Sequence, residues 1–238
     1  MAAKDYNLEQ PMDKLLDIAV KKFGEVEFKT VSVGESSLKI LQIKNMQGYI
    51  DKLMDQTRSG KKVVLPLWAK VWPSSIVMGV SLGRFPFADG SHILEIGAGG
   101  SLNGLALAMR GFDVTITDTD QDALLFSRIN ALKNGLEDSV TVRKTDLSDG
   151  LGMRFDYIIG CEMLYDEAQF EQLVGFVQEN LAEAPTAEVL LALDLKREAR
   201  GFFVKANESF NMMKTTAGFS DKETGDDKTV NLFRLRRK

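Results

Sequence analysis

Cysteine and histidine are almost absent from this chain, since Cys161 and His92 are the only examples among 238 residues. A single cysteine excludes an internal disulfide framework and is typical of a reducing compartment, so we expect a cytoplasmic protein. A single histidine argues against a histidine-rich metal site, and no metal ion is expected. The sequence also lacks a signal-peptide core and any apolar run long enough to span a bilayer, so no membrane association is expected.

A basic excess is lacking as well, because 34 acidic residues outnumber 30 lysines and arginines to give a net charge of −4. This balance gives no general attraction to nucleic acid, and no nucleic-acid partner is expected. The terminal basic cluster Arg234 to Lys238 is interpreted as a solvated tail. The hydrophobic content of 44% and the charged content of 27% are ordinary for a soluble globular protein.

Residues 93–104, ILEIGAGGSLNG, are the stretch around which the rest of the chain is organised. An apolar run containing Glu95 leads into a turn with Gly97, Ala98 and Gly99, and an amphipathic helix begins near Leu102. Glycines let the backbone pass close to a ligand, and the first N–H groups of the helix point into the same space. The order strand, glycine turn and helix predicts a nucleotide-binding corner.

The spacing of the glycines discriminates between nucleotides. A dinucleotide fingerprint requires a third glycine where this chain has Leu102, and no lysine follows at the spacing of a phosphate loop. Glu95, Gly97 and Gly99 instead follow the pattern Glu-x-Gly-x-Gly-x-Gly, with Ser101 in the last place. This pattern resembles the first motif of the seven-strand methyltransferases that use S-adenosylmethionine.

Strand and helix patterns alternate after Ser91, which predicts a parallel sheet with helices on both faces. We therefore expect an α/β fold with a Rossmann-like, seven-stranded, mostly parallel sheet and a small N-terminal α+β extension. The expected strands are 92–96, 113–117, 140–146, 155–162 and 188–195, with a helix near 198–210 and a closing antiparallel pair over 212–219 and 228–235.

The N-terminal residues form the predicted extension. Helical spacing indicates a helix over 12–23, alternation indicates a β-hairpin over 26–43, and a second helix begins after Asn45. We divide the chain into an accessory region, 1–62, and a catalytic domain, 63–238. The accessory region is expected to cover one end of the sheet and to help choose the substrate.

Ligands of open parallel sheets bind beyond the carboxyl ends of the strands, which selects a few side chains. Asp118 ends the second strand and could accept both hydroxyls of a ribose, whereas Asp120 is interpreted as a helix N-cap. Asp146 ends the third strand and could accept from an adenine amino group, with Leu147 lying on the ring; a plain turn residue is the alternative for Asp146.

Three further segments sharpen the resemblance. FDYIIGCEMLYDEAQFEQLV, which contains Glu162 and Tyr165, resembles the segment of seven-strand protein-lysine methyltransferases that has an acid-x-x-Tyr signature. VWPSSIVMGVSL resembles their tryptophan-containing lead-in helix, and LLALDLKREARGFF resembles their fifth strand and the helix after it. The resemblance extends over roughly 65–238.

The resemblance implies S-adenosyl-L-methionine as cofactor and a lysine of a protein as acceptor. Glu162 and Tyr165 are then the expected catalytic residues. Because a carboxylate favours the charged form of lysine, Glu162 is interpreted as an orienting group rather than a strong base. The side chains and backbone expected at the cofactor are those of Trp72, Glu95, Gly97, Ala98, Gly99, Asp118, Asp146, Leu147 and Cys161.

Three alternatives stay open from the sequence. The acceptor could be a small molecule or another protein nitrogen, because the fold says little about it. A binding protein that kept the fold but lost activity is a second alternative, supported by Ser101 in the glycine motif. An NAD oxidoreductase is the third, and it would need a glycine in place of Leu102.

Overall fold

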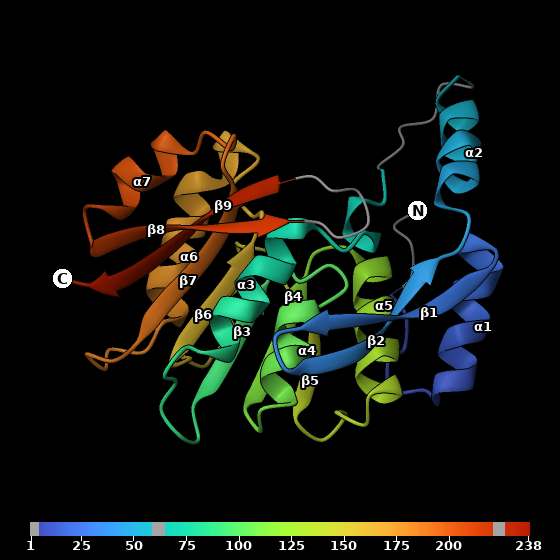
Figure 1. Cartoon of the computed structure of the whole chain (residues 1–238), viewed down its shortest axis with the longest axis horizontal. Helices are drawn as coiled ribbons and strands as arrows, with labels where there is room; N and C mark the ends of the chain where they lie inside the picture. The colour runs from blue at the N-terminus through green and yellow to red at the C-terminus, as the bar shows by residue number, and fades with distance from the viewer. Residues whose placement is uncertain (1–4, 59–64, 221–226) are drawn as a thin grey trace.

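A computed structural model describes residues 5–58, 65–220 and 227–238. Its centre is a seven-stranded sheet in the order β5-β4-β3-β6-β7-β9-β8, with helices on both faces (Figure 1). The predicted α/β fold class is confirmed. Within the described residues, none of the helices is long and apolar enough to cross a membrane.

The five parallel strands define where a ligand can bind. They are β3 (His92–Ile96), β4 (Asp113–Asp118), β5 (Val140–Lys144), β6 (Tyr157–Cys161) and β7 (Glu188–Asp194). The chain builds outward from β3 to β5 and then returns to place β6 on the other side of β3. The strand order therefore reverses between β3 and β6, which is the position where such sheets bind their ligands.

The sheet is completed by two long antiparallel strands, β8 (Phe210–Ser220) and β9 (Asp227–Arg237). β9 lies between β7 and β8, as predicted for a closing antiparallel pair. The prediction of a solvated C-terminal tail is wrong, because Arg234 and Arg236 both pair with the buried carboxylate of Glu188 on β7. Arg237 donates to the Leu181 carbonyl at the end of α6 (Phe170–Asn180).

Two helix layers enclose the sheet. On one face α3 (Pro73–Gly83) and α4 (Leu102–Ala108) share a core with β3, β4 and β6, and α5 (Gln121–Lys133) packs on β4 and β5. On the other face α6 and α7 (Arg200–Ala206), with the 3-10 turn η2 (Glu167–Gln169) before α6, cover a second core. The polar N-cap that begins α5 is Asp120, as predicted from the sequence.

The N-terminal region lies outside the first helix layer. It contains α1 (Met12–Phe23), the hairpin β1 (Val26–Val33) and β2 (Ser36–Ile43), and α2 (Met46–Arg58), which projects from the body in Figure 1. α1 packs on α5, and the hairpin packs on α3, α4 and α5 rather than on the sheet itself. The predicted boundary between residues 62 and 63 lies outside the described residues.

The expected lead-in helix is present as α3. A 3-10 turn, η1 (Leu67–Ala69), comes first, and α3 begins at Pro73, whose ring suits the first helical position. Trp72 is thus the residue before the helix. Trp68 packs edge-to-face on Phe126, with ring centroids 4.9 Å apart, so it belongs to the core.

Several predicted element ends are wrong by one to four residues. β5 stops at Lys144 because the chain turns at Asp146, whose carboxylate accepts the Ser148 N–H. β6 stops at Cys161 because Glu162 has a left-handed backbone, with φ of 56°. The predicted helix 198–210 shortens to Arg200–Ala206, since Phe210 already begins β8.

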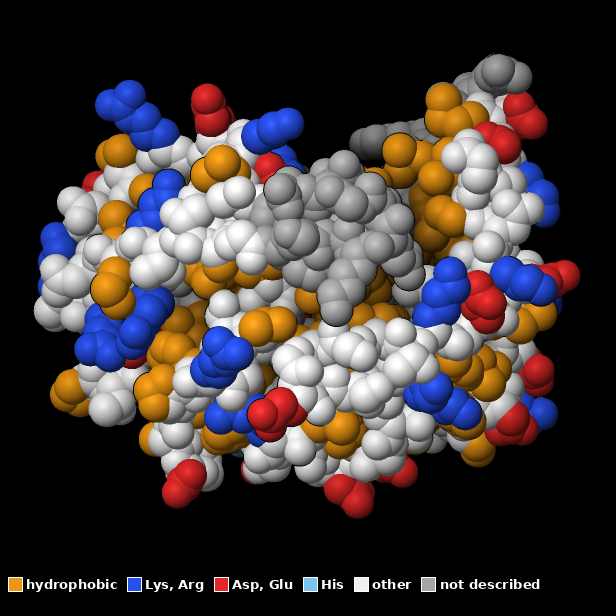
Figure 2. Space-filling model, in the orientation of Figure 1, with side chains coloured by type: hydrophobic (Ala, Val, Ile, Leu, Met, Phe, Trp, Pro, Cys, Tyr) orange, Lys and Arg blue, Asp and Glu red, His pale blue; other side chains and the backbone are white. Residues whose placement is uncertain are grey.

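On the face seen in Figure 2, the coloured basic and acidic side chains are interspersed along the outline of the molecule. Interspersed charges of both signs on this face do not favour strong electrostatic steering of one charged partner.

Candidate active site

The tips of four neighbouring strands meet at the switch in strand order. Ile96 at the end of β3 pairs with Thr117 of β4 on one side and Gly160 of β6 on the other. Asp118, at the end of β4, pairs with Lys144 at the end of β5. The glycine turn after β3, Asp118 and Glu162 therefore lie at one edge of the sheet.

The glycine turn has a left-handed backbone at three places. Gly97 and Gly99 have φ of 57° and 54°, and Ser101 has φ of 60° where the methyltransferase pattern expects another glycine. Ser101 is fully buried, and its hydroxyl bonds to the Ser127 hydroxyl on α5, which also donates to the Gly99 carbonyl. This hydroxyl pair attaches the turn to α5 and offsets the unfavourable backbone of a non-glycine residue.

The close approach that glycines permit is used in this turn. A Cβ at Gly97 would overlap the Met163 sulfur, and a Cβ at Gly99 would lie 3.1 Å from the Trp68 carbonyl oxygen. Side chains at these positions would therefore displace the segments that face the turn. Ala98, between the two glycines, donates its N–H to the Thr117 carbonyl and so continues the ladder between β3 and β4.

Glu95 is buried beneath the turn. Its Oε2 accepts the Gly104 N–H at 3.0 Å, one of the first free donors of α4. Burial raises the pKa of Glu95 to about 8; the Gly104 hydrogen bond opposes this rise and the charge of Asp118 adds to it. Glu95 thus braces the helix against the strand, and its direct contact with a cofactor stays a prediction.

Asp118 faces the glycine turn from the next strand. Its Oδ2 accepts the Gly99 N–H and its Oδ1 accepts the Asp120 N–H, both at 2.9 Å. Burial raises the pKa of Asp118, and these backbone donors oppose the rise. Each carboxylate oxygen keeps a second lone pair, so the fixed group can still accept two neighbouring hydroxyls.

The other residues predicted at the cofactor lie around this edge. Trp72 is half-buried and donates its indole N–H to the Leu67 carbonyl at 3.0 Å. Burial raises the pKa of the Cys161 thiol well above its usual value, which disfavours the thiolate form that acts as a nucleophile. Asp146 is exposed in the turn after β5. The half-buried Leu147 packs against the core that α6 covers. Their contacts with a cofactor stay predictions.

The Glu162 carboxylate is held by donors from two elements of the fold. Its Oε1 accepts the Ser74 hydroxyl from α3 and, at 2.6 Å, the Asp194 N–H from the end of β7. Its Oε2 is buried without a hydrogen bond, and the nearest cation is the Arg197 guanidinium at 3.5 Å. The left-handed backbone at Glu162 turns this carboxylate away from the strand direction.

A groove opens beside Glu162. Its volume is about 340 Å³, and its lining comes from the segment after β6 and the turn after β7: Leu164, Tyr165, Glu167, Phe170, Asp194, Lys196, Arg197 and Glu198. Tyr165 is 65% exposed at the rim. Partial burial raises the pKa of Tyr165, and the charges of Asp118 and Asp166 add to the rise.

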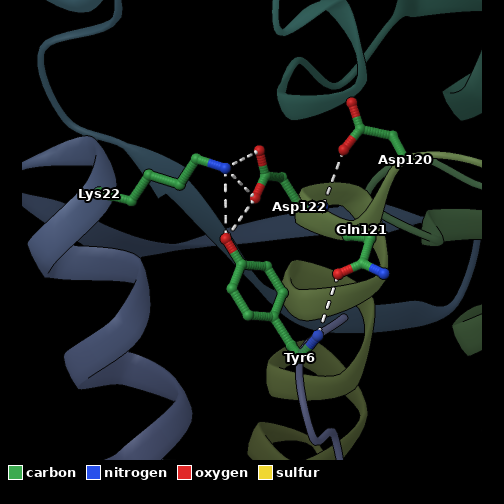
Figure 3. A network of polar contacts seen from close by, with 5 residues as sticks. All are labelled: Tyr6, Lys22, Asp120, Gln121 and Asp122. Atoms are coloured by element: carbon green, nitrogen blue, oxygen red, sulfur yellow. Dashed lines mark hydrogen bonds and ion pairs between the residues drawn. The ribbon is translucent and has the colours of Figure 1, made fainter. Parts of the chain in front are cut away.

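The N-terminal segment is attached close to this site. The Tyr6 hydroxyl and the Lys22 ammonium both bind the carboxylate of Asp122, in the first turn of α5 (Figure 3). The Tyr6 N–H also donates to the Gln121 side chain. Burial alone would lower the pKa of Lys22, but its bonds to Asp122 and Tyr6 raise it overall. The segment is thus fixed to the helix that follows Asp118.

Sequence reasoning missed two residues of the site. Ser74 reaches Glu162, and Met163 covers Gly97. Arg197, which lies in the segment LLALDLKREARGFF of the family resemblance, pairs with Glu162. The only sequence signal for Ser74 is its place just after Pro73 in the lead-in segment.

The polar groups at this edge of the sheet fit a cofactor that contains adenosine. Asp118 offers a fixed carboxylate to a pair of hydroxyls, and the glycine turn beside it leaves backbone close to the same space. With a seven-stranded sheet that ends in an antiparallel pair, these features define a Rossmann-like methyltransferase of the S-adenosylmethionine-dependent class.

Comparison with known proteins narrows this class. The sequence model described as lysine methyltransferase matches residues 66–210. Protein N-lysine methyltransferase METTL21A of Xenopus tropicalis is 30% identical over 172 residues, which cover 70% of this chain and 76% of that protein. METTL21A of Danio rerio is 29% identical over 156 residues, which cover 61% and 70%. This chain belongs to the lysine methyltransferase family, and it is an S-adenosylmethionine-dependent methyltransferase.

Solved structures support the fold. A ribosomal protein L11 methylase from Lactobacillus delbrueckii subsp. bulgaricus aligns with a TM-score of 0.55 at 20% identity, covering 69% of this chain and 79% of that chain. The glycopeptide N-methyltransferase MtfA, complexed with S-adenosyl-L-methionine, aligns with a TM-score of 0.54 at 17% identity, covering 69% and 94%. At these identities the likeness concerns the architecture of the sheet and its helices.

Proposed function

We propose that this protein transfers the methyl group of S-adenosylmethionine to a lysine side chain of a protein. The observation that carries the proposal is the Glu162 carboxylate after β6. One of its oxygens is fixed by Ser74 and Asp194, and the other pairs with Arg197, which lines the groove. Membership of the lysine methyltransferase family supports the same acceptor.

Asp118 and the glycine turn would hold the cofactor. Asp118 would accept the ribose hydroxyls, and the backbone of Gly97 and Gly99 would lie along the nucleoside. Asp146 and Leu147 would complete the adenine side. When bound, the cofactor supplies a methyl group on a positively charged sulfur, which is already electrophilic.

Glu162 and Tyr165 would receive the acceptor. A carboxylate beside a lysine stabilises its ammonium form, so Glu162 binds and aims the side chain rather than removing its proton. Tyr165, at the rim of the groove, offers a ring face on which an ammonium or its methylated form can lie. The protein contributes mainly orientation and exclusion of water.

The test is incubation with radiolabelled S-adenosylmethionine and a lysate from cells that lack this protein. We expect a labelled protein band whose modified residue is a lysine by mass spectrometry, and loss of the label with Glu162→Ala and with Tyr165→Phe. Glu183→Ala is the matched control, because Glu183 is exposed and pairs only with Arg154 among the described residues. Label confined to small molecules, or full transfer by both site variants, would contradict the proposal.

A further inference from the structure

We propose that Arg197 occupies the position of the substrate ammonium in the free enzyme and is displaced when the target lysine enters. The proposal rests on the proposed function, because it concerns the same carboxylate. Oε1 of Glu162 accepts two hydrogen bonds, whereas Oε2 accepts none from the described residues. Among the described residues, the only cation close to Oε2 is the Arg197 guanidinium.

The two oxygens of Glu162 have different surroundings. Oε1 receives two donors, the Ser74 hydroxyl and the Asp194 N–H, which come from two elements of the core. Oε2 is buried and makes no hydrogen bond, and the Arg197 nitrogen is 3.5 Å away, beyond a good charge-assisted bond. A buried carboxylate oxygen without a donor is costly, so this position favours a cation that bonds it more closely.

Arg197 is placed to leave this position at little cost. Its side chain is 38% exposed, whereas that of Glu162 is 16% exposed, so the guanidinium can move into water while the carboxylate stays. Its backbone N–H is held by the Asp194 carbonyl in the turn after β7, which anchors the chain but leaves the side chain free to swing. A partly exposed ion pair of this kind shifts an equilibrium by no more than about five-fold.

The groove supplies the route for the exchange. It is lined by Arg197 together with Tyr165 and Asp194, so a lysine side chain that enters it meets the guanidinium before it meets Glu162. An ammonium is smaller than a guanidinium and is a point charge with three donors, which suits a single oxygen. Exchange of one cation for another keeps the buried carboxylate neutralised throughout.

The test compares kinetics of the full-length enzyme, with the protein that the wild type labels in the lysate, purified unmethylated, as substrate. Arg197→Met should lower KM for that protein by about three- to five-fold and leave kcat within about two-fold, because the substrate no longer competes with the guanidinium. Arg197→Lys, which restores a cation, should return KM toward the wild-type value. Lys196→Met is the matched control: it removes a charge from the same groove, and the described part of the chain shows no ion pair between Lys196 and Glu162.

Each other result overturns the inference. An unchanged or higher KM in Arg197→Met, or an equal fall of KM in Lys196→Met, would show that Arg197 does not compete with the substrate. A kcat that falls about ten-fold, or a variant that no longer folds by circular dichroism, would make Arg197 a fixed support of the site. If the wild type labels no lysine, the proposed function fails first, and that result is separate from any effect of position 197.

Discussion

The Ser74 hydroxyl donates a hydrogen bond to the Glu162 carboxylate, although 88 positions of sequence separate the two residues. Ser74 lies in the first turn of α3 and is buried, with only 4% of its surface exposed. The lead-in helix therefore reaches the tip of β6 and fixes one oxygen of the acid-x-x-Tyr motif. This contact makes α3 a support of the Glu162 carboxylate as well as a cover of the sheet.

Ser74→Ala should lower kcat by about ten-fold, because a hydrogen bond to a charged group is lost and Glu162 can rotate. The affinity for S-adenosylmethionine, measured by calorimetry, should stay within about two-fold of the wild type. Ser75→Ala is the control, since among the described residues the neighbouring hydroxyl donates only to the Trp72 carbonyl at the start of the helix. Equal losses in both variants would indicate a general weakening of α3 instead.

Asp118→Asn should weaken binding of S-adenosylmethionine by about ten- to a hundred-fold, because a neutral amide replaces a charged acceptor for hydroxyls and places a donor against a backbone N–H. Calorimetry gives the dissociation constant directly. Asp120→Asn is the matched variant, because an asparagine keeps the oxygen that caps α5. Similar weakening in the two variants would remove Asp118 from the ribose site.

The local parts of this site could be predicted because their signals lie within a few residues. The run from β3 through the glycine turn to α4 combines an apolar strand, glycines at fixed spacing and a helical repeat. The N-cap at Asp120 depends only on its place before the helix. Parallel strands then bring their tips together without further information from the sequence.

The contacts that join distant segments could not be predicted. Ser74 and Glu162, or Met163 and Gly97, meet only because α3 and β6 pack in one particular register. Asp146 illustrates a local failure: the residue is polar and near a strand end, but an Asx-type turn with Ser148 ends the strand earlier. The alternation of apolar and polar residues predicts that a strand is present. Hydrogen bonds from side chains to the backbone, such as that between Asp146 and Ser148, determine where the strand ends.

Ser101→Ala and Ser101→Gly should separate the two effects at the left-handed position of the glycine turn. Alanine keeps the unfavourable φ of 60° and loses the bond to Ser127, so we expect a loss of about 1–2 kcal/mol in the free energy of unfolding. Glycine also loses the bond but removes the strain, so its stability should lie within about 1 kcal/mol of the wild type. Urea unfolding of the three proteins measures the difference. An alanine variant as stable as the glycine variant would show that the turn bears no strain.

Glu95→Gln should change how stability depends on pH. The pKa of Glu95 is about 8 in the folded protein against an ordinary value of 4.5, because burial disfavours its charge. Between these values the folded state holds a proton that the unfolded state has released. The stabilisation from this group is therefore complete below about pH 4.5 and is lost as the pH rises toward 8, by up to about 1.4 kcal/mol per unit.

Glutamine cannot ionise, and its side-chain oxygen can still accept the Gly104 N–H, so the variant lacks this loss. Urea unfolding at pH 5.5 and at pH 8 should therefore show Glu95→Gln gaining on the wild type at the higher pH. The other carboxyl groups titrate alike in both proteins, which makes the difference between the two curves specific to position 95. Parallel curves would mean that the Glu95 carboxylate is ionised in the folded protein, and that the brace between β3 and α4 is a charged one.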